Sequence, residues 1–493
     1  MSEAERAARR ERLEALRARG IDPYPARVGS VERIRDVRDR HEGDDAARLE
    51  ASSHRVAVAG RIMSQRSFGK LRFFDLVEDG VKLQVSARKG ETPDSVLELL
   101  DLLDVGDSVR VEGRLWRTRT GELTAAADGL VLLAKSLRPL PEKWHGLQDV
   151  EARFRHRHLD LLVNESARRV AFVRSATVRA IRAFLDARGF LEVETPVLQP
   201  LYGGAAARPF VTRLHVFDQE LYLRISDELY LKRLVVGGLD RVYEIGRDFR
   251  NEGVSRKHNP EFTMLECYQA YTDYRGMMEL VESMVEHLAR TVLGHTRVEY
   301  QGKAIELAGP YPRFTLREAI EQATGIDILE CADFASLAAA ARAKGLDPGQ
   351  APTWGRLVDH LFGEHVEPTL QQPTFMVDYP VELSPLAKRS AEDPRLVERF
   401  ELFVAGMEIG NAFSELNDPD DQRARFVEQR DAARAGDDEA HPMDEDYLRA
   451  LEHGLPPTGG LGVGVGRLAM VLADAPTLRE VELFPHLRPE PPQ

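Results

Sequence analysis

The chain has 493 residues, 43% of them hydrophobic and 30% charged, and its formal net charge is −14. That length allows two or three domains with cores of their own, and the composition is typical of soluble globular proteins. No apolar run approaches the roughly 18–20 residues of a membrane span, and residues 1–20 lack the apolar stretch of a secretory signal, so we expect a cytoplasmic protein with no membrane segment.

Charge is distributed unevenly along the chain. Residues 1–140 contain 26 Lys and Arg against 24 Asp and Glu, a net charge of +2, which leaves −16 for the remaining 353 residues. A polyanion is expected to prefer the N-terminal part, although a charge of +2 is also unremarkable by itself. The two cysteines, Cys267 and Cys331, fit a reducing compartment and exclude a cysteine-rich metal site.

The N-terminal part is predicted to combine a helical extension with a small barrel. Residues 2–19 and 31–50 favour two charged helices, so residues 1–52 are interpreted as the extension. Short β-prone runs separated by turn signals then fill residues 53–137, with one helical piece over Thr92–Leu103. Five strands with one inserted helix are typical of an OB-fold barrel, and an SH3-like or sandwich module is the alternative.

A second domain is predicted to follow a linker. The linker covers residues 138–150 and contains two prolines, and the second domain covers residues 151–493. Within it, residues 166–188 carry apolar side chains at helical spacing, and LEVETPVL (residues 191–198) favours a strand ended by Pro196.

The rest of this domain mixes strands with helices. Residues 315–365 are Ala-rich and favour a helical insertion, whereas strand patterns return at 374–382 and 400–415. The chain then ends in a Gly-rich strand and a helix, GGLGVGVGRLAMVLADA. Runs of antiparallel-type strands with scattered helices favour an α+β class over a doubly wound sheet.

One stretch, FRNEGVSRKHNPEFTMLECYQAY (residues 249–271), alternates charged groups with an aromatic ring. Arg250 and Glu252 precede a basic loop that includes His258, and Phe262 follows it. Guanidinium groups grip phosphates and an aromatic ring stacks on a base, so the stretch favours a nucleotide site. A solvated hairpin with a core phenylalanine is the alternative.

Two further clusters carry chemistry. FELFVAGMEIGNAFSELND spaces Glu401, Glu408 and Glu415 seven residues apart, and carboxylates beside a phosphate site are natural Mg²⁺ ligands, although surface acids have the same pattern. Arg467 follows Gly462, Gly464 and Gly466, small residues that would let a flat ligand lie against the backbone. The surrounding segment, GGLGVGVG, matches neither the dinucleotide nor the P-loop fingerprint.

These segments together resemble the bacterial-type class II lysyl-tRNA synthetases. LEVETPVL resembles the family's motif 1, RVYEIGRDFRNEG followed by HNPEFTMLECYQAY resembles motif 2, and GGLGVGVGRLAMVLADAPTLREVELFP resembles motif 3. GGAAARPF, LYLRISDELYLKRLVVGG and SLRPLPEKWHGLQDVE also match. Several ordered matches over almost the full chain are far more specific than any single motif.

The resemblance implies a fold, an activity and partners. It implies a six-stranded antiparallel sheet flanked by helices, a homodimer formed around motif 1, and an OB fold that reads the anticodon. The implied activity is ATP-dependent activation of L-lysine to lysyl-adenylate with release of pyrophosphate, followed by transfer to the 3′ end of tRNA(Lys), with Mg²⁺ as cofactor.

The resemblance also implies residue roles. Arg250 would hold the α-phosphate and the lysine carboxylate, and Glu252 and His258 would contact ATP. Phe262 and Arg467 would enclose the adenine, and Glu401 and Glu408 would bind Mg²⁺. Lysine's pocket would be lined by Gly204, Glu228, Arg250, Glu266, Tyr268, Asn411, Phe413 and Glu415.

Within that pocket the substrate's two ammonium groups need anionic partners. We assign Glu415 and Tyr268 to the ε-amine and Glu228 to the α-amine, and Glu266 suits either. In the barrel, Phe73 would stack on an anticodon base and Gln84 would hydrogen-bond its edge. A core role is the alternative for Phe73, and because Phe74 points to the opposite face, one ring should be buried and the other exposed.

The sequence departs from the family's usual pattern at Gly246, Asp248, Met407 and Gly466. Two of these positions adjoin Glu408 and Arg467, so a catalytically weakened or regulatory paralogue is one rival interpretation. A ligase that modifies proteins is another, but such relatives lack the barrel. Aspartyl and asparaginyl synthetases share the architecture, but their substrates would need a more cationic pocket.

Overall fold

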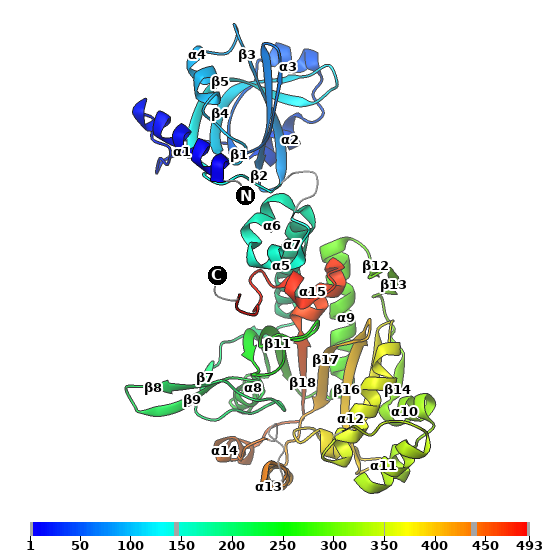
Figure 1. Ribbon diagram of the computed structural model, residues 1–493. Helices are drawn as coiled ribbons and strands as arrows, with labels where there is room; N and C mark the ends of the chain where they lie inside the picture. The colour runs from blue at the N-terminus through cyan, green and yellow to red at the C-terminus, as the bar shows by residue number, and fades with distance from the viewer. Residues whose placement is uncertain (1–2, 142–146, 350, 435–440, 491–493) are drawn as a thin grey trace. The chain divides into compact units, whose positions relative to one another are not determined.

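The structure, a computed structural model, describes residues 3–141, 147–349, 351–434 and 441–490 (Figure 1). Its chain divides into two compact units, residues 1–165 and residues 166–493, which we call the barrel unit and the sheet unit. The predicted linker, 138–150, falls partly on residues 142–146, which lie outside the described residues.

The barrel unit contains a closed five-stranded barrel in which the strand order is β1-β2-β3-β5-β4. One helix, α4 (Asp94–Leu100), is inserted between the third and fourth strands. The predicted OB-type barrel is therefore confirmed. Its strands are β1 (Arg55–Phe68), β2 (Leu71–Glu78), β3 (Val81–Arg88), β4 (Ser108–Arg117) and β5 (Leu123–Ala134).

Alternation along β2 explains how the barrel closes on its core. Phe74 and Leu76 are buried among apolar side chains of the other strands, whereas Phe73 points to the other face and is half-buried. The helix α1 (Glu3–Ala18) agrees with its prediction, but the single helix expected over 31–50 is wrong. The chain forms α2 (Ile34–His41) and α3 (Ala46–Ser52) instead, because Asp45 accepts a hydrogen bond from the Arg48 amide and starts a new helix. Two short helices, α5 (Val150–Arg155) and α6 (Arg157–Val163), complete the unit.

The sheet unit is built on an eight-stranded sheet with the order β14-β15-β16-β17-β18-β11-β10-β6. The six strands from β15 to β10 are antiparallel to their neighbours, as the family resemblance implies. The edge strands β14 and β6 pair in parallel, so the sheet as a whole is mixed. Its strands are β6 (Leu191–Glu192), β10 (Arg241–Phe249), β11 (Glu261–Ala270), β14 (Arg313–Thr315), β15 (Thr374–Pro380), β16 (Leu396–Val404), β17 (Met407–Ser414) and β18 (Thr458–Gly464).

The strand predicted over residues 191–198 forms only in part. β6 and β7 (Leu198–Gln199) are two residues long each, and the segment between them is irregular around Pro196, which has no amide hydrogen to donate. β7 joins a small sheet with the hairpin β8 (Val211–Leu214) and β9 (Gln219–Leu223), and β12 (Arg297–Tyr300) pairs with β13 (Lys303–Glu306).

One face of the large sheet packs on helices. Apolar residues of α7 (Glu165–Asp186), α9 (Tyr274–Leu293) and α15 (Val465–Ala473) form one core with the inward residues of the strands. The predicted helical insertion is present and packs a core of its own against β15 and β16. The remaining helices are α8 (Glu228–Val236), α10 (Leu316–Thr324), η1 (Ile328–Glu330), α11 (Phe334–Ala343), α12 (Trp354–His365), η2 (Glu367–Thr369), η3 (Val381–Leu383), α13 (Pro419–Arg434), α14 (Glu445–Glu452) and α16 (Leu478–Val481).

Candidate functional site

Three glycines of β18 lie between two strands that carry polar side chains. Gly460, Gly462 and Gly464 stand opposite Tyr268, Glu266 and Met264 of β11, and the first two also stand opposite Phe413 and Asn411 of β17. Because glycine has no side chain, the middle of this sheet face is left open while its flanks carry the functional groups. The glycine run therefore forms part of the wall of a cavity.

That cavity encloses about 340 Å³, a size suited to a small ligand. It is lined by thirteen of the fourteen sheet-unit residues that the sequence predicts for the site: Gly204, Glu228, Arg250, Glu252, His258, Phe262, Glu266, Tyr268, Glu401, Glu408, Asn411, Phe413 and Arg467. The fourteenth, Glu415, lies behind the lining at Gly460, where an added β-carbon would stand 1.9 Å from its Oε1. Residues up to 263 positions apart in sequence therefore share one cavity.

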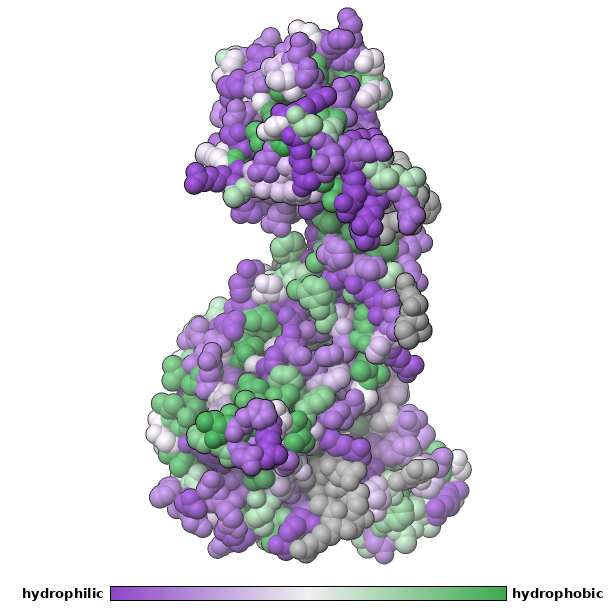
Figure 2. All heavy atoms as spheres, turned by 60° about the vertical axis from the view of Figure 1, so that its left-hand side comes forward, coloured by the Kyte–Doolittle hydropathy of each residue, from purple (hydrophilic) through white to green (hydrophobic). Residues whose placement is uncertain are grey.

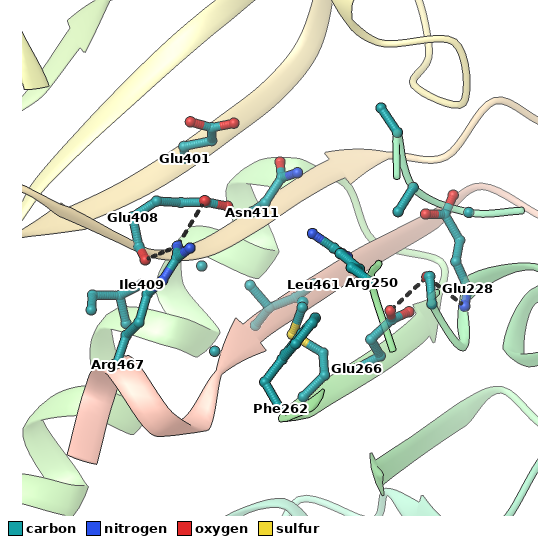
Figure 3. Close-up of a pocket in the computed structure, with 18 of the residues that line it drawn as sticks. Glu228, Arg250, Phe262, Glu266, Glu401, Glu408, Ile409, Asn411, Leu461 and Arg467 are labelled. Carbon is teal, nitrogen blue, oxygen red and sulfur yellow. Dashed lines mark hydrogen bonds and ion pairs between the residues drawn. The ribbon is translucent and has the colours of Figure 1, made fainter. Parts of the chain in front are cut away.

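Arg250 lies in the middle of this arrangement, between the Glu408–Arg467 pair and the carboxylates Glu228 and Glu266 (Figure 3). It follows directly after β10, and its guanidinium carbon is 5.1 Å from the ring centre of Phe262. A cation over an aromatic face is a favourable arrangement. Both side chains can therefore contact one ligand that spans the cavity.

At one end of the cavity, arginines and glutamates alternate. Arg467 donates through Nη1 to a carboxylate oxygen of Glu408 (3.0 Å) and to its carbonyl (2.8 Å), and Arg399 pairs with Glu401 at 2.6 Å. Burial, opposed by Arg399 and reinforced by Glu408, raises the pKa of Glu401 to about 7. Although burial acts against it, the charge of Arg467 lowers the pKa of Glu408. This end offers both cations for phosphate oxygens and carboxylates for a metal ion.

The basic loop supplies a neutral imidazole to the same end. His258 lies on the cavity rim, where its Nδ1 is 2.9 Å from the Ser255 hydroxyl. Partial desolvation, followed by the positive charges of Arg467 and Lys257, lowers the pKa of His258 to about 4. The ring is therefore uncharged at neutral pH and offers hydrogen bonds rather than charge.

At the other end, buried carboxylates gather around a buried lysine. Glu228 begins α8, and both Glu228 and Glu415 form ion pairs with Lys232, whose side chain is fully buried. Burial, opposed by Lys232, raises the pKa of Glu228 to about 7, and burial likewise raises the pKa of Glu415. This end offers carboxylates as partners for a positively charged group of a ligand.

Glu266 lies in the cavity wall at the same end as Glu228. It accepts hydrogen bonds from the Ser226 hydroxyl (2.7 Å) and the Tyr268 hydroxyl (3.0 Å). Burial raises the pKa of Glu266 in spite of those bonds. Gly204 faces the same group of residues with a φ of +87°, and a β-carbon there would stand 2.8 Å from the Ser226 hydroxyl, so only glycine fits.

A second buried charge cluster accounts for two departures from the family pattern. Arg224 is 1% exposed and pairs with Asp227 (2.8 Å), Glu244 (2.6 Å) and Asp248 (3.3 Å). A β-carbon on Gly246 would stand 1.8 Å from its Nη2, so Gly246 makes room for the guanidinium that Asp248 faces. Burial raises the pKa of Asp248 to about 7 and that of Asp227 to about 10.

Of the other two departures, Met407 lies on the core side of its strand, whereas Gly466 lines the cavity near the start of α15. Met407 is 5% exposed and points into the main core, while the next residue, Glu408, points into the cavity. Gly466 is buried in α15, and a β-carbon there would stand 2.8 Å from Cδ2 of Leu478. Arg467 is held by Glu408, so no acidic neighbour at position 466 is needed to brace it.

Three contributors to the site were missed from the sequence. Lys232 stands four residues after Glu228, a spacing that usually marks a surface pair on a helix. Arg399 precedes Glu401 by two residues, so both face the same side of β16. The role of Gly460 was not predicted, because its effect on the pocket depends on strand register, which cannot be deduced from the sequence.

The two barrel residues predicted to read a base lie on neighbouring strands. Phe73 of β2 has its ring 6.4 Å from that of Phe68, which is 64% exposed. Gln84 of β3 is 8% exposed and accepts a hydrogen bond from the Thr124 hydroxyl at 3.0 Å. The expectation of one exposed and one buried ring is met in part, since Phe74 is 1% exposed and Phe73 is half-buried.

Comparison with known families agrees with this architecture. A family profile described as tRNA synthetases class II (D, K and N) matches residues 149–488, and one described as an OB-fold nucleic acid binding domain matches residues 56–138. The chain therefore belongs to the class II tRNA synthetases.

Within that class, three similar proteins carry the same name. A lysine–tRNA ligase of Roseiflexus castenholzii is 53% identical over 480 residues, with 97% of each chain covered. Those of Pelotomaculum thermopropionicum and Staphylococcus aureus are 51% and 48% identical over 483 residues, with 98% and 97% of this chain and 94% and 97% of the relatives covered. Identity at this level over nearly the full length assigns the chain to the lysine–tRNA ligases, and the predicted family is confirmed.

Proposed function

We propose that this chain activates L-lysine with ATP and transfers it to the 3′ end of tRNA(Lys). The observation that carries the proposal is a single cavity with two unlike ends. One end holds Arg467, Glu401 and Glu408, suited to a metal-bound triphosphate, and the other holds the buried carboxylates Glu228 and Glu266. The relatives named above are lysine–tRNA ligases, which favours the same substrate.

The first reaction joins the two ends of the cavity. A lysine carboxylate oxygen attacks the α-phosphorus of ATP, and the bond from that phosphorus to the β-phosphate oxygen breaks, which releases pyrophosphate. Arg250 is central enough to bind both the carboxylate and the α-phosphate and to stabilise the charge that develops there. The tRNA 3′-hydroxyl then attacks the lysyl carbonyl, and AMP leaves.

Each end of the substrate pair has assigned partners. Phe262 and Arg467 enclose the adenine, and Glu252 and His258 contact ATP from the rim of the cavity. On the lysine side, Glu228 binds the α-ammonium and Glu415 with Tyr268 binds the ε-ammonium. Gly204, Glu266, Asn411 and Phe413 complete the pocket.

Class II synthetases work with ATP and divalent metal ions, and Glu401 and Glu408 are suited to hold Mg²⁺. Both are carboxylates on neighbouring strands at the phosphate end, which is the donor chemistry that Mg²⁺ prefers. The ion would neutralise phosphate charge there. Within the described residues, Asp227, Asp248 and Glu266 bring carboxylate oxygens within 4.8 Å of one another, but Arg224 supplies the positive charge in that cluster.

Pyrophosphate exchange across the twenty amino acids tests the proposal. We expect exchange that requires lysine and Mg²⁺. Comparable exchange with aspartate or asparagine and none with lysine would contradict it, and no exchange with any amino acid would identify a non-catalytic paralogue.

A homodimer around motif 1 is the assembly that we propose. Apolar side chains are exposed on the sheet unit along α7, the motif 1 segment and the β8–β9 hairpin, and Figure 2 shows hydrophobic residues gathered on the face turned forward. They include Phe172, Leu191, Val197, Leu198, Val211, Val216 and Phe217. Sedimentation of Val197→Asp should show monomers, whereas Val131→Asp, at a similarly exposed position on the barrel, should leave a dimer.

We also propose a cytoplasmic location, supported by two cysteines that form no disulfide. Among the described residues, no helix is long and apolar enough to cross a membrane.

The barrel unit would bind the tRNA anticodon through Phe73 and Gln84.

A further inference from the structure

A lysine of the protein itself lies directly behind the proposed lysine pocket. Glu228 and Lys232 stand one helical turn apart on α8, and the fully buried ammonium of Lys232 pairs with Glu228 and with Glu415, which follows β17. The rings of Phe413 and Tyr447 flank it, with centres 5.6 Å and 5.9 Å from Nζ. Lys232 does not itself line the cavity.

Of the two carboxylates, Glu228 lines the cavity and Glu415 lies just behind its lining. Glu415 uses Oε2 for Lys232, while its buried Oε1 makes no hydrogen bond within the described part of the chain and lies beside Gly460 and Tyr268. Glu228 uses Oε1 for Lys232 and lines the cavity beside Gly204. Lys232 therefore anchors each carboxylate from the side away from the substrate.

Charge counting gives the reason for such an anchor. Three buried glutamates, Glu228, Glu266 and Glu415, would repel one another and take up protons if no cation stood among them. Lys232 offsets one of the three negative charges that these glutamates carry when ionised. A lysine substrate, with two ammonium groups and one carboxylate, carries +1.

We propose that Lys232 is a positioning residue for lysine recognition, whose ammonium pairs with Glu228 and Glu415, opposes their protonation and orients them for the two ammonium groups of the substrate. This inference rests on the proposed function and adds to it a residue that touches no substrate atom. The titratable and charged groups that face this pair of carboxylates are Lys232, Glu266, Tyr268, Arg399 and Tyr447.

Lys232→Met tests the inference against Arg233→Met. Arg233 is the next residue of α8 and pairs with Asp444 at 2.8 Å outside the cavity, so its variant makes the same charge change without touching the pocket. In pyrophosphate exchange, Lys232→Met should raise the KM for lysine about tenfold or more and leave the KM for ATP within about threefold. Arg233→Met should change neither.

The pH profile separates positioning from a merely structural role. Burial raises the pKa of Glu228 to about 7 while Lys232 opposes that rise, so loss of the ammonium should move the midpoint of the lysine KM profile upward by about one pH unit or more. A folded Lys232→Met enzyme with the lysine KM and midpoint of Arg233→Met would overturn the inference.

A charge-neutral pair of changes keeps the test open if Lys232→Met does not fold. Glu415→Gln leaves Lys232 to serve Glu228 alone, whereas Lys232→Gln with Glu415→Gln removes both charges together. The profile midpoint should be higher in the double variant than in Glu415→Gln, and equal midpoints would overturn the inference. An unchanged lysine KM in Glu415→Gln would instead show that the proposed pocket assignment is wrong, while lysine-dependent exchange by the wild type upholds the activity in every case.

Discussion

At Gly466, neighbouring residues compensate for the absence of a side chain. Its place beside Arg467 suggests at first a missing brace, yet Glu408 holds that arginine through its carboxylate and its carbonyl. Leu478 fills the space that a larger residue would need at position 466. Glycine at position 466 thus accommodates Leu478, and its presence does not remove a group that Arg467 needs.

We therefore expect Gly466→Asp to lower stability and not to improve catalysis. Its β-carbon would meet Leu478, and overpacking a core costs about 1–3 kcal/mol in the free energy of unfolding. Gly363→Asp is the matched control, since Gly363 also lies in a helix but has no atom within 4 Å of an added β-carbon. Denaturant unfolding should show the loss in the first variant only. A hundredfold gain in pyrophosphate exchange by Gly466→Asp would contradict this account.

Glu228 gives the lysine site a dependence on pH. Burial raises the pKa of its carboxyl to about 7, and the proton must leave before the carboxylate can bind the α-ammonium of lysine. The KM for lysine should therefore rise as pH falls, by about tenfold between pH 8 and pH 6. Measurements at saturating ATP isolate this effect from Glu401, whose pKa is also raised to about 7. A flat profile in the wild type would show that Glu228 does not bind the amine.

At the scale of an element, β18 combines two glycines with different surroundings. A β-carbon on Gly460 would stand 1.9 Å from Oε1 of Glu415 and 2.5 Å from the Tyr268 ring, whereas one on Gly464 would have nothing nearer than 3.8 Å. The strand therefore requires glycine at Gly460, near the lysine end of the cavity, but could accept a larger side chain at Gly464, near the nucleotide end.

Alanine at these two positions should have opposite consequences. Gly460→Ala displaces Glu415 and Tyr268, and loss of a hydrogen bond to a charged group costs about 1.5–3 kcal/mol, or about tenfold or more in kcat/KM for lysine. Gly464→Ala should leave lysine use within about threefold of the wild type. The lysine and ATP dependence of pyrophosphate exchange measures both. Equal damage from the two changes would mean that the glycines serve the strand and not the pocket.

At the scale of the whole molecule, the fold class and most of the site could be predicted because their signals are local. Alternating β-prone runs indicate the barrel, and Arg250, Phe262 and Glu266 fall within one short stretch that forms β10, its loop and β11. The role of Lys232 could not be predicted, because a Glu–Lys spacing of four residues is the same in an exposed helix as in a buried one. Its burial depends on how β17, α8 and α14 meet, which no local pattern contains.

The barrel and the sheet belong to separate compact units, so their roles can be tested separately. Phe73 lies on the barrel unit, and the adenylate chemistry is assigned to the sheet unit, so Phe73→Ala should slow tRNA charging and spare pyrophosphate exchange. Stacking on one base is worth about 1–3 kcal/mol, which corresponds to about 5-fold to 150-fold in tRNA affinity.

Gln84→Ala should add to the charging defect, but it also breaks a buried hydrogen bond to Thr124, so the unfolding of this variant must be measured as well. Phe74→Ala supplies the contrast, because this neighbouring ring is 1% exposed and its loss should destabilise the barrel by about 3–5 kcal/mol. If Phe73→Ala slows exchange and charging equally, the ring serves the structure and does not read the anticodon.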